Sequence, residues 1–163
     1  MRLFIAMESE EIQEELAKLQ EKLQINGRKI KKEQIHLTLK FIGEQKKVEE
    51  IRKVLRKIAF SPMELEVENL GTFPGRKGSL LYLKIKKSKE LEQLYQRIEQ
   101  GLFQKGIPRD QRKYLPHITL ARNVYSYENQ VPLPKRFLVD GYHLKESCFT
   151  ENGVEYHRIE SYD

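Results

Sequence analysis

Apolar residues recur along this chain with two different periods, which predict the helical and the extended segments. Three stretches place apolar residues three or four positions apart, so that one face of an α-helix would be buried. These positions are Ile12, Leu16, Leu19 and Leu23; Val48, Ile51, Leu55 and Ile58; and Leu91, Leu94, Tyr95, Ile98 and Leu102. Ser9 and Ser88 are suited to cap the first and third helices. Gly27 is expected to end the first helical region, and Gly106 and Pro108 the third.

Strands are predicted between these helices, where β-branched and apolar residues dominate or alternate with polar ones. The expected strands are 2–7, 35–42, 62–70, 79–86, a strand opened by Pro116, 137–146 and 154–160. The stretch 73–78, which holds Gly and Pro, and the polar stretch 123–135 are expected to be loops. A basic loop, 109–115, is expected just before Pro116.

One short pattern occurs twice. His36-Leu37-Thr38-Leu39 and His117-Ile118-Thr119-Leu120 both read His-apolar-Thr-Leu, 81 residues apart (117 − 36). Successive side chains of a strand face opposite ways, so each histidine shares a face with the threonine two positions on. An imidazole can move a proton near neutral pH, and a hydroxyl can donate a hydrogen bond to an anionic oxygen. Two such pairs facing each other would suit phosphate-ester chemistry, with one proton taken and one given.

The order of elements favours an α+β fold. A helix of similar length precedes each motif, which indicates an approximate internal repeat, although no helix is expected after the second motif. Few helices and many strands are typical of α+β proteins with mostly antiparallel sheets. A length of 163 residues favours a single domain. Residues 1–163 are therefore expected to form one bilobal domain with two mostly antiparallel sheets.

Composition narrows the functional classes. Hydrophobic residues make up 39% and charged residues 33%, which is typical of a folded rather than a disordered chain. No apolar run approaches the roughly 20 residues of a membrane span, and the apolar start is interpreted as a strand, not a signal peptide. Cys148 is the single cysteine, so no disulfide framework is expected and a cytoplasmic location is favoured. The net charge of +6 is compatible with a polyanionic partner such as RNA.

The extended motifs resemble those of the two-histidine phosphoesterase superfamily, and within it the RNA 2′,3′-cyclic phosphodiesterases, also called 2′-5′ RNA ligases. The similar stretches are Arg2 to Ala6, Ile35 to Glu44, Pro116 to Arg122, and Leu144-x-Glu146-Ser147 with Gly153 and Tyr156 following. The chain departs from the family at Arg28-Lys29-Ile30, where the family usually has Arg-Trp-Val, and it contains no tryptophan. These departures concern edges that would face the substrate.

The resemblance implies a fold and a reaction. The helices would lie outside two sheets, with the active-site cleft between them. The reaction would be hydrolysis of an RNA 2′,3′-cyclic phosphate to a 2′-phosphate, by a monomer that needs no metal ion or other cofactor. We hypothesise that His36 is the acid on O3′ and His117 the base on water, although the reverse assignment is equally compatible with the sequence. Thr38 and Thr119 would donate hydroxyl hydrogen bonds to the phosphate.

Arg122 resembles the phosphate-binding arginine of the family, and a guanidinium suits a phosphodiester anion. Simple alternation points Arg122 away from His117, so the strand must bend, bulge or end near residue 121. By the same parity Lys40 shares the face of His36 and either adds positive charge or is solvated. Phe41 and Tyr114 are candidates for stacking on a base, with core packing as the alternative.

Other charged and titratable residues are less specific. A set of basic loop residues either follows an RNA backbone or is merely solvated; these are Arg76, Lys77, Arg109, Arg112 and Lys113. His143 and His157 lack a threonine two residues on, and they are interpreted as structural or surface residues.

Three other functions are compatible with parts of this pattern. The same histidine pair could serve 2′-5′ phosphodiester cleavage or RNA ligation. A binding module for RNA or nucleotide ends could keep the pocket without turnover. A metal hydrolase is disfavoured, because the histidines have no carboxylate or cysteine at ligand spacing.

Overall fold

The structure, a computed structural model, describes residues 1–163 and contains the three expected helices. They are α1 (Glu10–Lys22), α2 (Val48–Arg56) and α3 (Lys89–Phe103), and a short 3-10 helix, η1 (Lys32–Gln34), is also present. The Ser9 hydroxyl accepts a hydrogen bond from the amide of Ile12 at 3.2 Å, and the Ser88 hydroxyl accepts one from Leu91 at 3.1 Å. Both predicted N-caps are therefore formed. No helix is long and apolar enough to span a bilayer.

Nine strands complete the α+β fold. They are β1 (Arg2–Met7), β2 (Asn26–Lys29), β3 (Leu37–Glu44), β4 (Met63–Phe73), β5 (Ser79–Ile85), β6 (His117–Ser126), β7 (Arg136–Val139), β8 (Tyr142–Thr150) and β9 (Gly153–Tyr162). Every paired neighbour is antiparallel, in the order β7-β4-β5-β6-β3-β1-β8-β9, and β2 pairs with β6. The two sheets expected from the sequence are thus joined into one hydrogen-bonded path where β3 meets β6.

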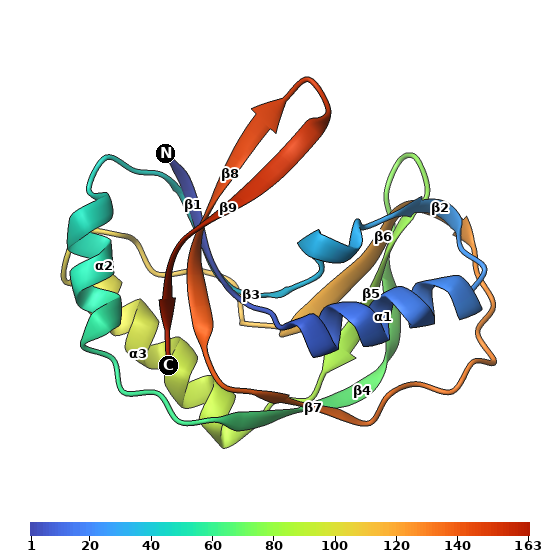
Figure 1. Ribbon diagram of the computed structural model, residues 1–163, viewed down its shortest axis with the longest axis horizontal. Helices are drawn as coiled ribbons and strands as arrows, with labels where there is room; N and C mark the ends of the chain where they lie inside the picture. The colour runs from blue at the N-terminus through green and yellow to red at the C-terminus, as the bar shows by residue number, and fades with distance from the viewer.

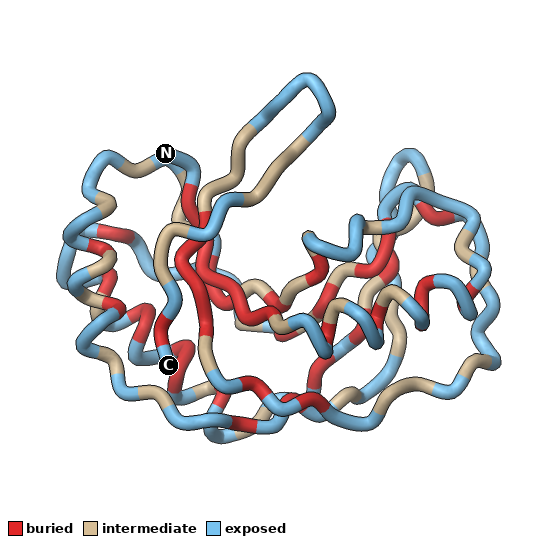
Figure 2. Tube along the Cα trace, in the orientation of Figure 1, coloured by how far each residue is buried: buried red, intermediate tan, exposed pale blue.

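Helices cover the two halves of this path on different sides (Figure 1). Helices α2 and α3 lie together beside the half that contains β1, β8 and β9, whereas α1 lies across β5 and β6. The buried Gln20 on α1 donates its side-chain amide to the carbonyl of Leu120 at 2.8 Å, which fastens this helix to β6. Buried residues follow the middle of the strands and the inward faces of the helices (Figure 2), and 31 of them form one apolar cluster.

Several local predictions are wrong. The expected strand 137–146 is two strands, because residues 136–139 pair with β4 as β7, whereas residues 142–150 pair with β9 as β8. Pairing between distant segments also explains the other differences. Residues 123–126, expected to be loop, continue β6 because Val124 pairs with Ser79 and Ser126 with Asn26. Strand β2 was not expected, since its four residues are all exposed and show no apolar alternation. Gly27 lies within β2 and does not end the region. A Cβ atom there would come within 2.9 Å of the Val124 backbone, so the close approach of β2 to β6 requires glycine.

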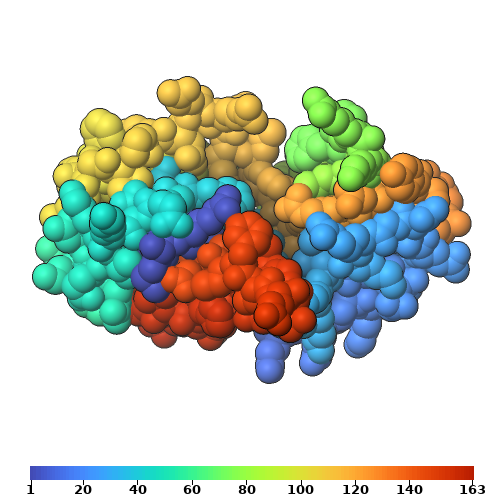
Figure 3. Space-filling view, turned by 90° about the horizontal axis from the view of Figure 1, so that it is seen from above, coloured from blue at the N-terminus to red at the C-terminus, as the bar shows by residue number.

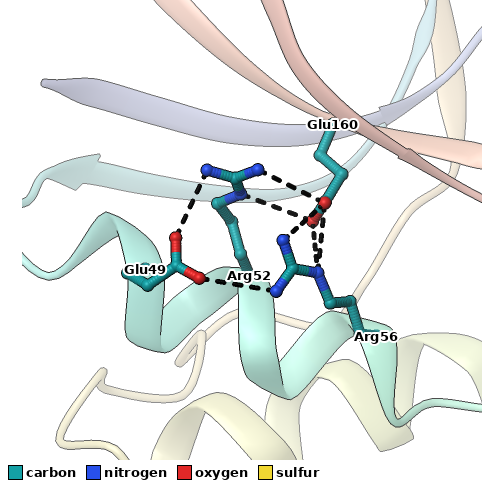
Figure 4. Close-up of polar contacts among 4 residues, drawn as sticks. All are labelled: Glu49, Arg52, Arg56 and Glu160. Carbon is teal, nitrogen blue, oxygen red and sulfur yellow. Dashed lines mark hydrogen bonds and ion pairs between the residues drawn. The ribbon is translucent and has the colours of Figure 1, made fainter.

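A group of four charged residues ties the last strand to α2 (Figure 4). Glu160 on β9 accepts hydrogen bonds from Arg56 at 2.7 Å and from Arg52 at 3.4 Å, and both arginines also contact Glu49. These hydrogen bonds, chiefly those from Arg56, lower the pKa of Glu160 to about 2. The carboxylate therefore stays ionised across the range in which most proteins are folded.

Candidate active site

The two His-x-Thr motifs meet at the centre of the sheet. Leu37 on β3 pairs directly with Ile118 on β6, and both side chains are fully buried. Continuing this antiparallel register by one residue in each direction sets His36 opposite Thr119, and His117 opposite Thr38. The two motifs are therefore related by a local two-fold arrangement. Their histidines and threonines lie on the face opposite the buried Leu37 and Ile118.

Both histidine rings are held by the same backbone contact. The Nδ1 atom of His36 lies 2.7 Å from the carbonyl oxygen of Gln34, and Nδ1 of His117 lies 2.7 Å from that of Leu115. A carbonyl can only accept, so Nδ1 carries a proton and Nε2 is left to exchange one. Nε2 of His36 lies 2.9 Å from the hydroxyl of Thr38.

Aromatic rings flank each imidazole. His36 packs against Phe4 and Tyr156, with ring centroids 5.3 and 5.6 Å away. His117 packs edge-on against Phe73 and Tyr82, at 6.0 and 5.4 Å. These contacts fix the orientation of each ring and remove water from part of its surface.

Burial lowers the pKa of His36 below its ordinary value of 6.5. The hydrogen bond to the Gln34 carbonyl opposes this shift, whereas the positive charge of Lys145 adds to it. The charge of His117 lowers the pKa of His36 further, because protonating one ring disfavours protonating the other. Near neutral pH the free protein therefore holds His36 in its neutral form.

Each motif ends in a bulge at the same position, its last leucine. On β3, Thr38 and Lys40 pair with the adjacent residues Ala6 and Ile5, so Leu39 is the extra residue. On β6, Thr119 and Ala121 pair with Tyr82 and Leu81, so Leu120 is the extra residue. Each bulge reverses the alternation of side chains after the threonine.

The bulges reverse the sides of the strands on which strict alternation would place Arg122 and Lys40. Arg122 is exposed, and the bulge at Leu120 turns residue 122 to the face of the sheet that carries His117, as the sequence required. The parity argument for Lys40 is wrong. Its side chain is only 2% exposed and points away from His36, with its ammonium 2.5 Å from Glu99 and 3.0 Å from Asp110.

The two aromatic candidates differ in their surroundings. Phe41 is 72% exposed, and its ring lies 6.2 Å from that of Phe4, which in turn contacts His36. Tyr114 is packed, with its ring stacked on Tyr95 at 4.2 Å and its hydroxyl donating to the Thr38 carbonyl at 3.0 Å. Of the two, Phe41 therefore offers a free ring face beside the motifs.

A groove of about 320 Å³ is lined in part by Phe4 and Tyr156, the two rings that contact His36. Six of its nine lining residues are hydrophobic, and they include Phe4, Phe41, Phe149 and Tyr156. The guanidinium of Arg2, also in the lining, lies 5.9 Å from the centre of the Phe149 ring. Seen from above, the molecule is hollowed between the segment near residue 110, the β4–β5 loop and the β8–β9 hairpin (Figure 3).

The remaining basic loop residues and the other two histidines differ in exposure and in their partners. All five basic loop residues are exposed: Arg76, Lys77, Arg109, Arg112 and Lys113. Arg109 also donates to Gln100 at 3.2 Å. His143 is buried against the Ser161 hydroxyl at 2.8 Å, and burial lowers its pKa. His157 is exposed, 3.8 Å from Glu155.

Sequence reasoning missed a buried ion pair beside the first motif. Glu8 accepts a hydrogen bond from Lys145 at 2.6 Å and another from Arg158 at 3.3 Å, and Lys145 lies 5.7 Å from the centre of the Tyr156 ring. Both Glu8 and Lys145 act on the pKa of His36. The one sequence signal near this ion pair was the position of Lys145 between Leu144 and Glu146 of the C-terminal signature. No group of three or more His, Cys, Asp or Glu side chains is arranged to hold a metal ion.

An antiparallel α+β fold with two His-x-Thr motifs paired at its centre defines a two-histidine phosphoesterase. A model of the 2′-5′ RNA ligase superfamily matches residues 8–144, and the chain belongs to this superfamily.

Comparisons with individual proteins agree with this membership. The RNA 2′,3′-cyclic phosphodiesterase of Methanocaldococcus jannaschii is 30% identical, over 99% of this chain and 100% of that protein. The protein of the same name from Bacillus subtilis is 33% identical, over 53% of this chain and 50% of its own length. Among solved structures, E. coli LigT in apo form gives a TM-score of 0.83 at 23% identity, over 99% and 95% of the two chains. LigT complexed with 3′-AMP gives 0.79 at 23% identity, over 99% and 96%.

Proposed function

We propose that this protein hydrolyses RNA ends that carry a 2′,3′-cyclic phosphate and leaves a 2′-phosphate, with one histidine as acid and the other as base. The pairing of Leu37 with Ile118 carries this proposal, because it brings two oriented imidazoles and two threonines to one face of the sheet. The names of the M. jannaschii and B. subtilis relatives support the same substrate class.

The proposed reaction balances without a metal ion, since two imidazoles supply both proton transfers. His117 takes a proton from water as the water oxygen bonds to phosphorus. The bond from phosphorus to O3′ then breaks, and His36 gives its proton to O3′. Thr38 and Thr119 donate hydrogen bonds to the nonbridging oxygens, and the Arg122 guanidinium stabilises their growing negative charge.

The acid role of His36 follows from a difference between the motifs. Phe41 and Arg122 occupy the same place, five residues after each histidine. An aromatic ring suits a nucleobase, whereas a guanidinium suits a phosphate. A nucleoside seated toward Phe41 brings its leaving O3′ to the side of His36, and water attacking in line then approaches from the side of His117.

The lowered pKa of His36 opposes the acid role in the free protein, but the bound substrate changes its surroundings. A phosphate anion beside the ring favours the protonated form and raises its pKa. Proton transfer takes place in that complex, so we assign His36 as the acid.

A short RNA ending in 2′,3′-cyclic phosphate, incubated with the protein and EDTA, tests the reaction. Wild-type protein should produce a 2′-phosphate, whereas His36→Ala and His117→Ala should each lose roughly 10²–10⁴-fold in rate. The exposed His157→Ala serves as the matched control and should keep full activity. Near wild-type turnover in both motif variants would refute the mechanism. Binding without turnover by wild type would instead indicate a binding module, and joined or cleaved 2′-5′ strands would indicate the other activities of the superfamily.

A substrate with sulfur in place of O3′ tests the assignment of acid and base, because a thiolate leaves with less need of a proton. His36→Ala should recover most of its lost activity on this substrate, and His117→Ala should not. The opposite pattern would exchange the two roles.

A further inference from the structure

The hydrogen-bonded contact between the two motif strands is short. Leu37 and Ile118 are the only residues registered as partners between β3 and β6. A single pair fixes the register but leaves the two strands free to splay on either side of it. The distance between the histidines must therefore depend on contacts outside the ladder.

A buried ionic cluster anchors the bulge of the first motif. The ammonium of Lys40 contacts Glu99 on α3, Asp110 at 3.0 Å and the carbonyl of Pro108 at 3.1 Å. Glu99 also accepts a hydrogen bond from the backbone amide of Asp110 at 2.7 Å. Lys40 and Glu99 are 2% and 3% exposed. The chain at 108–110 is thereby bound to both β3 and α3.

The same stretch of chain reaches both motifs. The Tyr114 hydroxyl donates to the carbonyl of Thr38, in the first motif. The carbonyl of Leu115, the next residue, accepts from Nδ1 of His117, in the second motif. Two adjacent residues therefore contact both motifs: Tyr114 holds the Thr38 backbone, and Leu115 orients the His117 ring.

Stacked rings connect Tyr114 back to the ionic cluster. The rings of Tyr95 and Tyr114 lie 4.2 Å apart and are parallel within 5°. The Tyr95 hydroxyl donates to Asp110 at 3.0 Å, on the carboxylate that also binds Lys40. The contacts thus close a ring from Lys40 through Asp110, Tyr95 and Tyr114 to Thr38. Connected hydrogen bonds and stacked rings of this kind favour one arrangement of their parts.

We infer that Tyr114 is a positioning residue, which couples the two motifs and is held in place by the Lys40–Glu99–Asp110 cluster. This inference rests on the proposed function for its effect on catalysis. Tyr114 touches neither histidine side chain in this arrangement; it acts through the Thr38 backbone and the Leu115 carbonyl. A shift of about 1 Å in a catalytic group is enough to lower a rate about 10²-fold.

Tyr114→Phe tests the inference, because it removes the hydroxyl and keeps the ring that stacks on Tyr95. Turnover should fall about 10- to 100-fold, with little change in KM for a cyclic mononucleotide. Tyr142→Phe is the control, since the buried Tyr142 likewise donates its hydroxyl to a backbone carbonyl, that of Leu55. Neither residue belongs to the ring of contacts around Tyr114. The control variant should keep wild-type turnover.

A measurement without substrate separates this inference from the proposed function. The imidazole nitrogen resonances of His117, followed by NMR, should shift in Tyr114→Phe and stay unchanged in Tyr142→Phe. Asp110→Asn, at a partly exposed position, should give the same shift and provides a second variant if Tyr114→Phe folds poorly. Unchanged His117 resonances in both Tyr114→Phe and Asp110→Asn, or equal loss of turnover in Tyr142→Phe, would overturn the inference.

Discussion

The buried pair of Lys40 and Glu99 allows a prediction with a definite size. The ammonium of Lys40 is almost inaccessible to solvent, and Glu99→Leu removes its buried carboxylate partner. Its remaining partners are the partly exposed Asp110 and the carbonyl of Pro108. Removing one member of a buried ion pair destabilises proteins by about 3–5 kcal/mol. Because Asp110 still offsets part of the charge, we expect a loss of about 3 kcal/mol.

Lys40→Met should be less damaging than Glu99→Leu. The carboxyl of Glu99 keeps the hydrogen bond from the amide of Asp110 and can take up a proton, which removes its charge. We expect a loss of about 2 kcal/mol, the ordinary penalty for a buried polar group that loses a partner.

The double variant decides whether this reasoning holds. With both charges replaced by apolar groups of similar size, stability should return to within about 1 kcal/mol of wild type. Unfolding in urea, followed by circular dichroism, measures all four proteins. For a chain of 163 residues, with about 2.1 cal/mol/K of unfolding entropy per residue, a loss of about 3 kcal/mol corresponds to a Tm about 9 °C lower. Additive losses in the double variant, or a Glu99→Leu loss below about 1 kcal/mol, would refute the ion-pair account.

Four further predictions concern the site and its pH dependence. Arg122→Ala should lower kcat/KM about 10²-fold on cyclic phosphate, and Arg122→Lys should restore only part of it, because an ammonium lacks the two-pronged geometry of a guanidinium; full rescue by lysine would show that charge alone matters. Phe41→Ala should raise KM for a cyclic mononucleotide about 5- to 150-fold and leave kcat unchanged, as expected when base stacking of about 1–3 kcal/mol is lost. An unchanged KM would remove Phe41 from the base site. The free energy of unfolding should fall as the pH drops below 6.5, because unfolded His36 binds a proton that the buried ring resists, and His36→Asn should weaken this dependence in a urea titration at several pH values. Glu160→Gln should destabilise the protein above about pH 4.5 through loss of the contacts from Arg56, and the difference from wild type should vanish as the pH falls toward about 2; a constant difference over that range would contradict the lowered pKa.

Much of the fold was predictable from local patterns. The apolar stripes and the serine caps of α1 and α3 depend on residues within one or two helical turns, and the structure contains both helices where the pattern predicts them. The motif strands were recognisable for the same reason. Strand β2 was not, because its four exposed residues carry no period and extend only by pairing with β6.

The sequence by itself determined which residues we propose as the catalytic set: two histidines, each with a threonine two positions on, and an arginine after the second motif. Only the tertiary structure decided where the neighbouring side chains point. The bulges at Leu39 and Leu120 arise from the register with β1 and β5, and a register belongs to two strands rather than to one. That register turns Lys40 into the interior and Arg122 toward the histidines, which strict alternation within a single strand does not predict.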